Sequence, residues 1–283
     1  MPPEVISDGA QVSAILDSPD YVVPPAPAVP DDETGTLAWL RAHVARFCDG
    51  DLHAIRRTLV TRELASLDPV RLRFAAADLT SDELSKAGAE PFDAMSLARR
   101  VPVAVLAFAL GLDEDKLTEA TDAVLAAASG YPNPDQAGPD ADASVSYLAT
   151  VLGPAEADTL ANKIGLLMQA SDATAGLIGN ALIAAFTDES DDVDEILAAT
   201  LRDNPPVLRT RRLDPAGELV TLDISGATFG AGRRPCPGAD QATALAAGVL
   251  DAILPACELA DQQLGYLPSP NLRIPAELLI TVS

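Results

Sequence analysis

The stretch Phe229-Gly-Ala-Gly-Arg-Arg-Pro-Cys-Pro-Gly238 carries the densest pattern of special residues in the chain. Glycines stand at positions 230, 232 and 238, and prolines stand on both sides of Cys236. Glycine lets the backbone take unusual dihedral angles and approach a flat group closely, while proline stiffens a loop. An Ala/Leu-rich stretch typical of a helix, 239–254, follows directly. We therefore expect a rigid loop that presents one cysteine at the start of a helix.

The cysteine in this setting is suited to bind a metal. A thiolate is a strong ligand for haem iron and pushes electron density onto it. Such a ligand needs a depressed pKa, which a helix N-terminus and nearby arginines supply. Arg233 and Arg234 precede Cys236 closely. The alternative interpretation is a Gly/Pro turn around a buried structural cysteine.

The spacing of these residues resembles the cysteine loop of the cytochrome P-450 (haem-thiolate) family, in its actinobacterial type. That loop has Phe, then Gly three residues on, then Arg, Cys and Gly at two-residue steps. The matching residues here are Phe229, Gly232, Arg234, Cys236 and Gly238, with Gly230 as a further match. The resemblance implies haem b bound through the Cys236 thiolate, with the residues of this loop lining the cofactor.

Composition excludes several classes of partner. The net charge is −23, so nucleic acid and anionic membrane surfaces are unlikely partners. Apolar residues make up 48% of the 283 residues and aromatic residues only 4%, which favours helices around a core of small aliphatic side chains. The longest apolar run, 101–112, is too short to span a bilayer.

Cysteine usage and the N-terminus indicate a compartment. The chain has three cysteines, an odd and sparse set that argues against a disulfide framework. The first residues lack the basic region and apolar core of a signal peptide. We expect a soluble cytoplasmic protein.

Periodicity predicts a mainly α fold with a small β component near the C-terminus. Helical patterns cover about 34–47, 51–66, 92–111, 113–128, 154–187 and 191–203. Strand patterns are few, at 218–224 and at 278–282. We expect one domain over residues 1–283, a truncated cytochrome P-450 fold. The N-terminal helix and first sheet strands of the family are expected to be missing, because 7–17 already resembles the second family helix.

A second candidate site lies on the helix expected at 51–66. His53 and Arg57 are four residues apart and share one helix face. Two donors on one face suit an anion, although a solvated face is the ordinary explanation for such a pair. The resemblance implies that this helix binds a haem propionate. The other histidine, His43, is expected to be an ordinary surface residue.

The expected helix at 154–187 contains an isolated carboxylate. Asp172 is the only charged residue between Lys163 and Asp188, and burying it is costly unless it is partnered or functional. The segment resembles the family's oxygen-activating helix, Ala/Gly-Gly-x-Asp/Glu-Thr. Either Asp172 takes the acid position and Ala173 replaces the threonine, which we prefer, or Thr174 is the threonine and Ala173 replaces the acid. Asp172 and Thr174 are the candidate catalytic residues; a solvated Asp is the alternative.

The stretch after residue 200 completes the resemblance and also departs from it. Residues 201–212 look like the family's helix, Pro-Pro turn and first sheet strand, and Arg212 falls at the strand arginine that reaches a propionate. Arg202 matches the family's Glu-x-x-Arg, but Ala199 replaces the glutamate. Only 16 residues, 213–228, separate Arg212 from Phe229, so the usual meander is largely absent.

Taken together, the resemblance implies a shortened haem-thiolate monooxygenase. It would act on a small organic substrate of the secondary-metabolite type, with electrons from a ferredoxin. The missing relay group leaves open a haem enzyme with other chemistry, such as peroxide use, isomerisation or dehydration. A non-catalytic relative that activates another enzyme is the third alternative, and a degenerate fragment without haem is the fourth.

Overall fold

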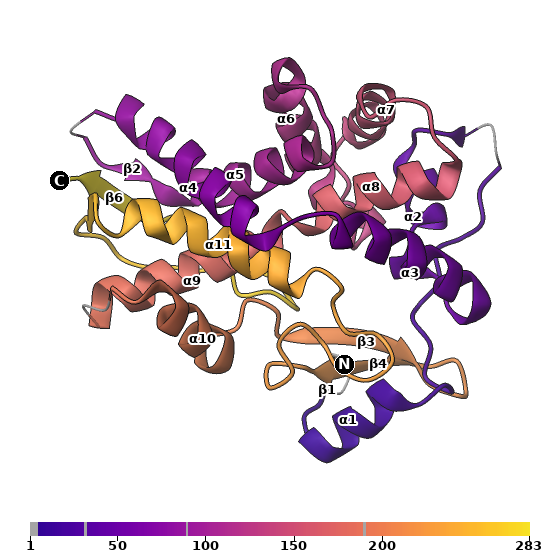
Figure 1. The fold of residues 1–283 in the computed structure, drawn as a ribbon. Coiled ribbons are helices and arrows are strands. Elements are labelled where there is room, and N and C mark those ends of the chain that lie inside the picture. Colours follow the sequence, from indigo (N-terminus) through magenta and orange to yellow (C-terminus); the bar gives the residue numbers. More distant parts are fainter. Residues whose placement is uncertain (1–4, 31–32, 89, 189–190) are drawn as a thin grey trace.

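A computed structural model describes residues 5–30, 33–88, 90–188 and 191–283 (Figure 1). Helices make up most of it. They are α1 (Gly9–Asp17), α2 (Leu37–His43), α3 (Gly50–Ala65), α4 (Pro69–Lys86), α5 (Ala94–Ala109), α6 (Leu117–Ala128), α7 (Ala141–Val151), α8 (Ala157–Gln169), α9 (Asp172–Asp188), α10 (Val193–Asp203) and α11 (Ala239–Ile253). A short 3₁₀ turn, η2 (Ala45–Phe47), joins α2 to the start of α3.

Many helices begin at a side-chain cap that the sequence encodes locally. A carboxylate or hydroxyl before the first turn accepts a backbone N–H that has no partner inside the helix. These capping residues are Asp8, Thr36, Asp49, Asp68, Asp93 and Asp192.

Two small sheets flank the helices. The first joins β1 (Val5–Ile6), β4 (Leu219–Asp223) and β3 (Arg209–Leu213) in that order, with β1 parallel and β3 antiparallel to β4. The second joins β2 (Phe92–Asp93), β6 (Leu279–Val282) and β5 (Cys257–Leu259), all antiparallel. Figure 1 shows the first sheet and α1 on one side of the helical body.

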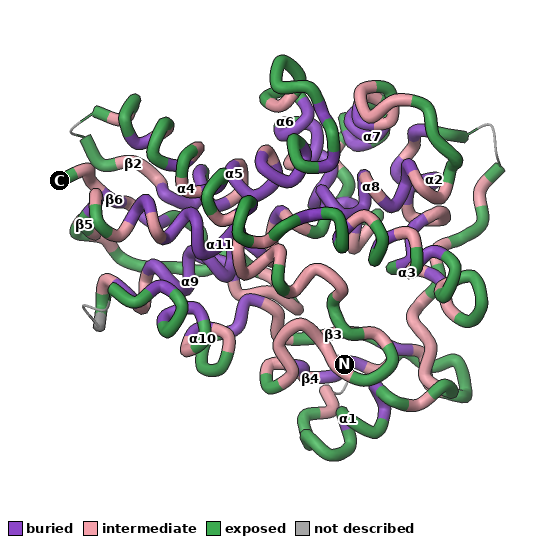
Figure 2. The backbone as a smooth tube through the Cα atoms, in the orientation of Figure 1, coloured by how far each residue is buried: buried purple, intermediate pink, exposed green. Residues whose placement is uncertain are grey.

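The core lies among the central helices (Figure 2). One large cluster of buried apolar side chains unites α2, α4, α5, α6, α8, α9 and α11. A smaller cluster lies between α1 and the first sheet, formed by Val12, Ile15, Leu16, Leu222 and Ile224. Within the described ranges, no helix combines the length and apolar composition that crossing a membrane requires.

The mainly α prediction is confirmed, with differences in detail. The expected strands at 218–224 and 278–282 correspond to β4 and β6, while β1 and β2 add strands from the N-terminal half. The helix expected at 154–187 is broken into α8 and α9 by a turn at residues 170–171. Helices α4 and α7 were not among the expected ones.

Helices α4 and α11 pack with their backbones unusually close. A Cβ atom added at Gly248 of α11 would lie 2.1 Å from the Arg73 carbonyl oxygen of α4 and 2.8 Å from the Ala76 Cβ. Backbone atoms cannot give way as a flexible side chain does. Gly248 therefore sets the distance between the two helices that bury most of each other's apolar surface, and this packing supports the helix that follows Cys236.

We expect the substitution Gly248→Ala to lower the free energy of unfolding by about 2 kcal/mol, because overpacking outweighs the gain in helix propensity. Gly9→Ala is the matched control, since nothing lies within 4 Å of a Cβ at Gly9. Urea unfolding of both variants measures the difference. Equal stability of Gly248→Ala and wild type would show that α4 and α11 separate without cost.

Candidate functional site

The cysteine loop is a closed turn that carries Cys236 to the start of α11. The Cys236 N–H donates to the Phe229 carbonyl at 2.6 Å, and the Gly230 N–H donates to the Ala227 carbonyl at 2.7 Å. Phe229 has a φ of 68°, the only positive φ of a non-glycine residue in the described chain. Such a backbone is sparsely populated and is held by its surroundings. Within the loop, Gly230 and Gly232 also have positive φ values, 73° and 67°.

The loop rests directly on the end of α1. A Cβ atom at Gly232 would lie 2.5 Å from the Leu16 carbonyl oxygen, so only glycine fits there. The neighbouring Arg233 N–H donates to that same carbonyl at 3.2 Å. On its other side the loop is tied to α10, where the Thr228 hydroxyl donates to the Leu201 carbonyl at 3.1 Å.

Cys236 is an exposed thiol, whereas Cys48 and Cys257 are buried. Desolvation by the surrounding protein raises the pKa of Cys236 above its ordinary value, and the Gly238 N–H, Arg57 and Arg46 oppose that rise. The surroundings in the protein therefore raise the pKa of Cys236, where the sequence led us to expect a depressed pKa. A bound metal ion is itself the largest local charge and deprotonates a coordinating thiol. The electropositive neighbours favour the same charged form.

His53, Arg57 and Arg234 lie together beside the cysteine loop. Arg57 donates from a terminal nitrogen to the Pro235 carbonyl at 2.5 Å, and the Arg234 Nε lies 3.3 Å from the His53 Nε2. Burial, with Arg234 next, lowers the pKa of His53 to about 4. His53 is therefore a neutral imidazole at neutral pH that offers one ring nitrogen to its neighbours.

Arg212 completes the cationic group. It lies on β3, is buried, and donates to the Thr210 hydroxyl at 3.1 Å and to the Arg211 carbonyl at 2.8 Å. Burial lowers the pKa of Arg234 to about 10, Asp49 opposes this, and Arg212 contributes to it. Arg212 and Arg234 are thus close enough to repel each other, and the Asp49 carboxylate offsets part of this charge.

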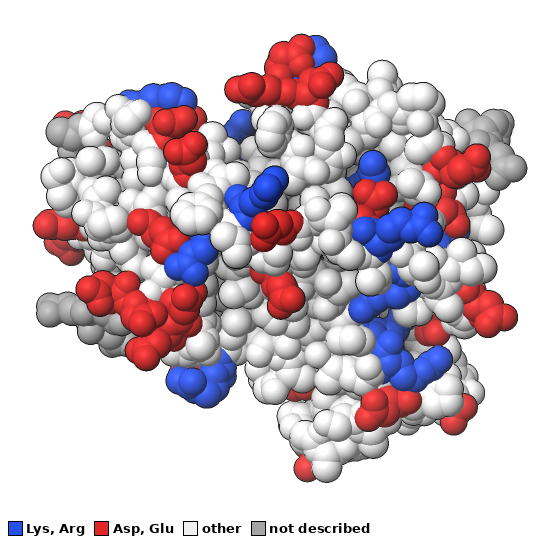
Figure 3. Space-filling model, viewed as in Figure 1, with Lys and Arg blue, Asp and Glu red and all other residues white. Residues whose placement is uncertain are grey.

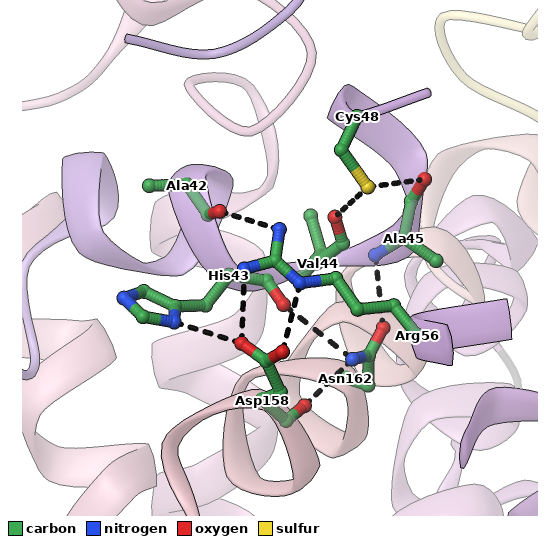
Figure 4. A network of polar contacts seen from close by, with 8 residues as sticks. All are labelled: Ala42, His43, Val44, Ala45, Cys48, Arg56, Asp158 and Asn162. Carbon is green, nitrogen blue, oxygen red and sulfur yellow. Dashed lines mark hydrogen bonds and ion pairs between the residues drawn. The ribbon is translucent and has the colours of Figure 1, made fainter. Parts of the chain in front are cut away.

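A buried polar network fixes the segment behind this group (Figure 4). The Asp158 carboxylate of α8 accepts two hydrogen bonds of 3.0 Å from Arg56 and lies 2.9 Å from the His43 Nδ1. Arg56 also donates to the Ala42 carbonyl at 2.6 Å. Asn162 accepts the Ala45 N–H at 3.0 Å and donates to the Asp158 carbonyl at 2.6 Å.

The network matters to the site because it orients backbone acceptors. The Arg234 guanidinium donates to the Ala45 carbonyl at 3.3 Å and to the Cys48 carbonyl. Both carbonyls belong to the segment that Asp158 and Asn162 hold against α8. His43 is therefore part of a structural network, and the expectation that it is an ordinary surface residue is wrong.

Helix α9 places the two candidate catalytic residues on different faces. Asp172 is the first residue of α9 and is partly exposed, while Thr174 is buried. Positions two apart on a helix lie about 200° apart. Burial raises the pKa of Asp172, opposed by Arg99 of α5. Asp172 thus keeps its proton to a higher pH than an ordinary carboxyl group, and Thr174 does not share its environment.

Position 202 shows what the loss of the glutamate means. With Ala199 in its place, Arg202 is exposed and pairs with its neighbour Asp203, with contacts of 3.1 and 2.8 Å. This arginine consequently does not link α10 to the cysteine loop.

Four further residues were not predicted from the sequence. Arg41 lies over the Phe47 ring at 4.0 Å from its centre, and Arg46 lies 5.7 Å from the same centre. Phe47 packs edge-on against the buried Tyr131 at 5.3 Å. Arg46 also donates to the Gln169 side chain at the end of α8 at 3.1 Å. No local motif marks these residues, because η2 and α8 meet only in the folded chain.

The side chains around Cys236 fit a haem. An exposed thiol at a helix N-terminus supplies an iron ligand, and the glycines of the positive-φ turn carry no side chain. His53, Arg57, Arg212 and Arg234 supply hydrogen-bond donors for two carboxylates, and the chain offers few carboxylates of its own there. The thiol and the hydrogen-bond donors therefore match a haem, which takes a thiolate ligand and carries two propionates.

Comparison with known proteins identifies the fold. No protein-family model and no curated protein matches the sequence. Among solved structures, CalO2 matches with a TM-score of 0.81 at 16% identity, over 99% of this chain and 90% of that chain. CYP154A1 from Streptomyces coelicolor A3(2) matches with 0.75 at 19% identity, over 99% and 91%.

A third similar structure is P450BioI, solved in complex with an acyl carrier protein ligated to hexadec-9Z-enoic acid. Its TM-score is 0.75 at 17% identity, over 97% of this chain and 91% of that chain. These likenesses establish the fold: the chain has the cytochrome P-450 fold.

We expect Asp158→Asn to lower the free energy of unfolding by about 3 kcal/mol at neutral pH, because it leaves the buried Arg56 without its counter-charge. Hydrogen bonds from Arg56 and His43 outweigh burial and hold the pKa of Asp158 below its ordinary 3.8. The contribution is therefore complete above that value and is lost as the pH falls through the lower, folded value. Chemical unfolding at a series of pH values measures it.

Asp115→Asn is the control, since Asp115 forms an exposed pair with Lys116 and its loss should leave stability unchanged. An Asp158→Asn protein as stable as wild type at neutral pH would contradict the role of the network.

Proposed function

We propose that this protein binds haem b through Cys236 and acts as a haem-thiolate monooxygenase on a small organic substrate. The observation that carries the proposal is the exposed Cys236 thiol at the start of α11, closed by the Phe229 carbonyl and surrounded by His53, Arg57 and Arg234. When bound through a thiolate, haem supplies the activation of dioxygen for insertion of one oxygen atom into a substrate.

The chain's own residues would take three roles: an iron ligand, residues that bind the propionates, and glycines that leave room for the ring. Cys236 provides the thiolate, and the Gly238 N–H, which acts to lower the pKa of this thiol, stabilises its charge. His53, Arg57, Arg212 and Arg234 would hold the two propionates by charge-assisted hydrogen bonds. Because the loop glycines have no side chain, the backbone could lie close to the edge of the haem ring.

Asp172 is the residue suited to hold and pass a proton. Its raised pKa leaves it protonated closer to neutral pH, which is the requirement for a general acid. Its neighbour Ala173 has no hydroxyl to continue the relay, and Thr174 lies on another face of α9. Substrate or ordered water would have to supply the second proton-carrying group.

A second function is favoured by the incomplete relay. A haem-thiolate protein that uses peroxide, or that isomerises or dehydrates its substrate, does not need a complete chain of proton donors. Ala173 and the unlinked Arg202 are the observations that favour it. A non-catalytic partner of another enzyme would need neither, but the intact cysteine loop argues against that function. Electrons for a monooxygenase would come from a ferredoxin.

Haem binding is tested by the absorption spectrum. Purified protein reduced under carbon monoxide should show the strongly red-shifted Soret band of thiolate ligation, and Cys236→Ala should lose it because no other thiol is exposed. Cys48→Ala and Cys257→Ala are matched controls that should keep the band, since both thiols are buried. A wild-type protein that stays colourless after haem reconstitution would refute the proposal.

The proton relay is tested by the product formed per reductant consumed. We expect poor coupling in the wild type with hydrogen peroxide released into solution. Asp172→Asn should reduce product formation by about 10²-fold or more, because it removes the general acid. Ala173→Thr should improve coupling by restoring a hydroxyl. Tight coupling in the wild type, unaffected by Asp172→Asn, would place the proton source elsewhere.

A further inference from the structure

Positive charge gathers around the candidate site in excess of what a haem neutralises. The chain has a net charge of −23. Of the arginines that make no ion pair with any residue in the described parts of the chain, seven belong to this region: Arg41, Arg46, Arg57, Arg211, Arg212, Arg233 and Arg234. Figure 3 shows basic side chains in a column between α3 and the β3–β4 hairpin. Two propionates would offset only part of this charge.

The arginines fall into two groups by their contacts. Arg57 and Arg234 contact the cysteine loop and His53, and Arg212 lies near Arg234 and is also influenced by Arg46. Arg41 and Arg46 instead flank Phe47, on the side of Tyr131 and the end of α8. Burial lowers the pKa of Arg41, and Arg46 and Arg211 add to this effect, while Tyr131 opposes it. No carboxylate is among these influences on Arg41.

The contacts that Arg41 and Arg46 make leave N–H donors of both guanidinium groups free to bind an anion. Arg41 stacks on Phe47 and donates one terminal nitrogen to the Tyr131 carbonyl. Arg46 donates one terminal nitrogen to Gln169. Each guanidinium has five N–H donors in a planar fork that matches a carboxylate, so both keep donors free.

The position of the pair relates it to the substrate side of the site. Gln169 is the last residue of α8, and the break that leads to Asp172 follows at once. Arg46 also lies near enough to Cys236 to lower its pKa. A group held between Arg41 and Arg46 therefore lies at the end of α8, between the cysteine loop and the start of α9.

We infer that Arg41 and Arg46 bind the carboxylate of an organic-acid substrate, an inference that rests on the function proposed above. The pair selects a ligand with an apolar body and one acidic end, the apolar part contacting Phe47 and the acid taking the free N–H groups. This adds a substrate class that the cysteine loop does not specify.

The test compares decanoate with 1-decanol, which differ in the acidic end alone. Isothermal titration of the full chain, with and without haem, should show that wild type binds decanoate at least roughly tenfold more tightly. The double variant Arg41→Gln/Arg46→Gln should lose this preference. Arg62→Gln, which removes an exposed charge in the last turn of α3, should keep it.

Haem retention separates the two carboxylate sites. The rate of haem transfer to apomyoglobin should be unchanged in the double variant and faster in Arg57→Ala. A double variant that loses haem as fast as Arg57→Ala, or that keeps the preference for decanoate, would overturn the inference, as would a wild type with no preference. A chain that takes up no haem refutes the proposed function alone, because titration of the haem-free double variant still decides the role of Arg41 and Arg46.

Discussion

The site depends on one partly buried ion pair, Arg56 with Asp158. It joins α3 to α8, two helices whose paired residues are 102 positions apart in the sequence. The pair is acceptable in the interior because each partner has further hydrogen bonds, from His43 to the carboxylate and from Arg56 to the Ala42 carbonyl. The segment 42–48 is held between the two helices as a result, and the backbone acceptors of Arg234 come with it.

That arrangement explains how a strongly acidic protein keeps a cationic site. Arginines without carboxylate partners repel each other and lose hydration when partly buried, so each needs fixed acceptors to stay in place. Backbone carbonyls meet this need without cancelling the charge: those of Cys48 and Ala45 for Arg234, and that of Pro235 for Arg57. The charge therefore remains available to an anion that enters from outside.

The parts of the structure that sequence reasoning predicts are the local ones. The cysteine loop was predicted because its glycines and prolines encode their own backbone, and the long helices because a broad apolar stripe marks them. Helix α4 was missed since its buried face includes Ala76 and Thr80, which weakens the pattern. The Asp158 network and the pair Arg41 and Arg46 were missed for another reason: their partners are distant in sequence and share no motif.

The departures from the family pattern are connected to one another. With Ala199 one turn before it, Arg202 pairs with its neighbour Asp203, and α10 contacts the cysteine loop through the Thr228 hydroxyl. The loop is supported from its other side by α1, where Gly232 meets the Leu16 carbonyl. Helix α1 thus helps to support the cysteine loop. The small apolar cluster between α1 and the first sheet, which includes Leu222 of β4, links that sheet to the loop. Damage to that cluster would therefore reach the Cys236 thiol through the backbone at Gly232, although the cluster lies outside the cysteine loop.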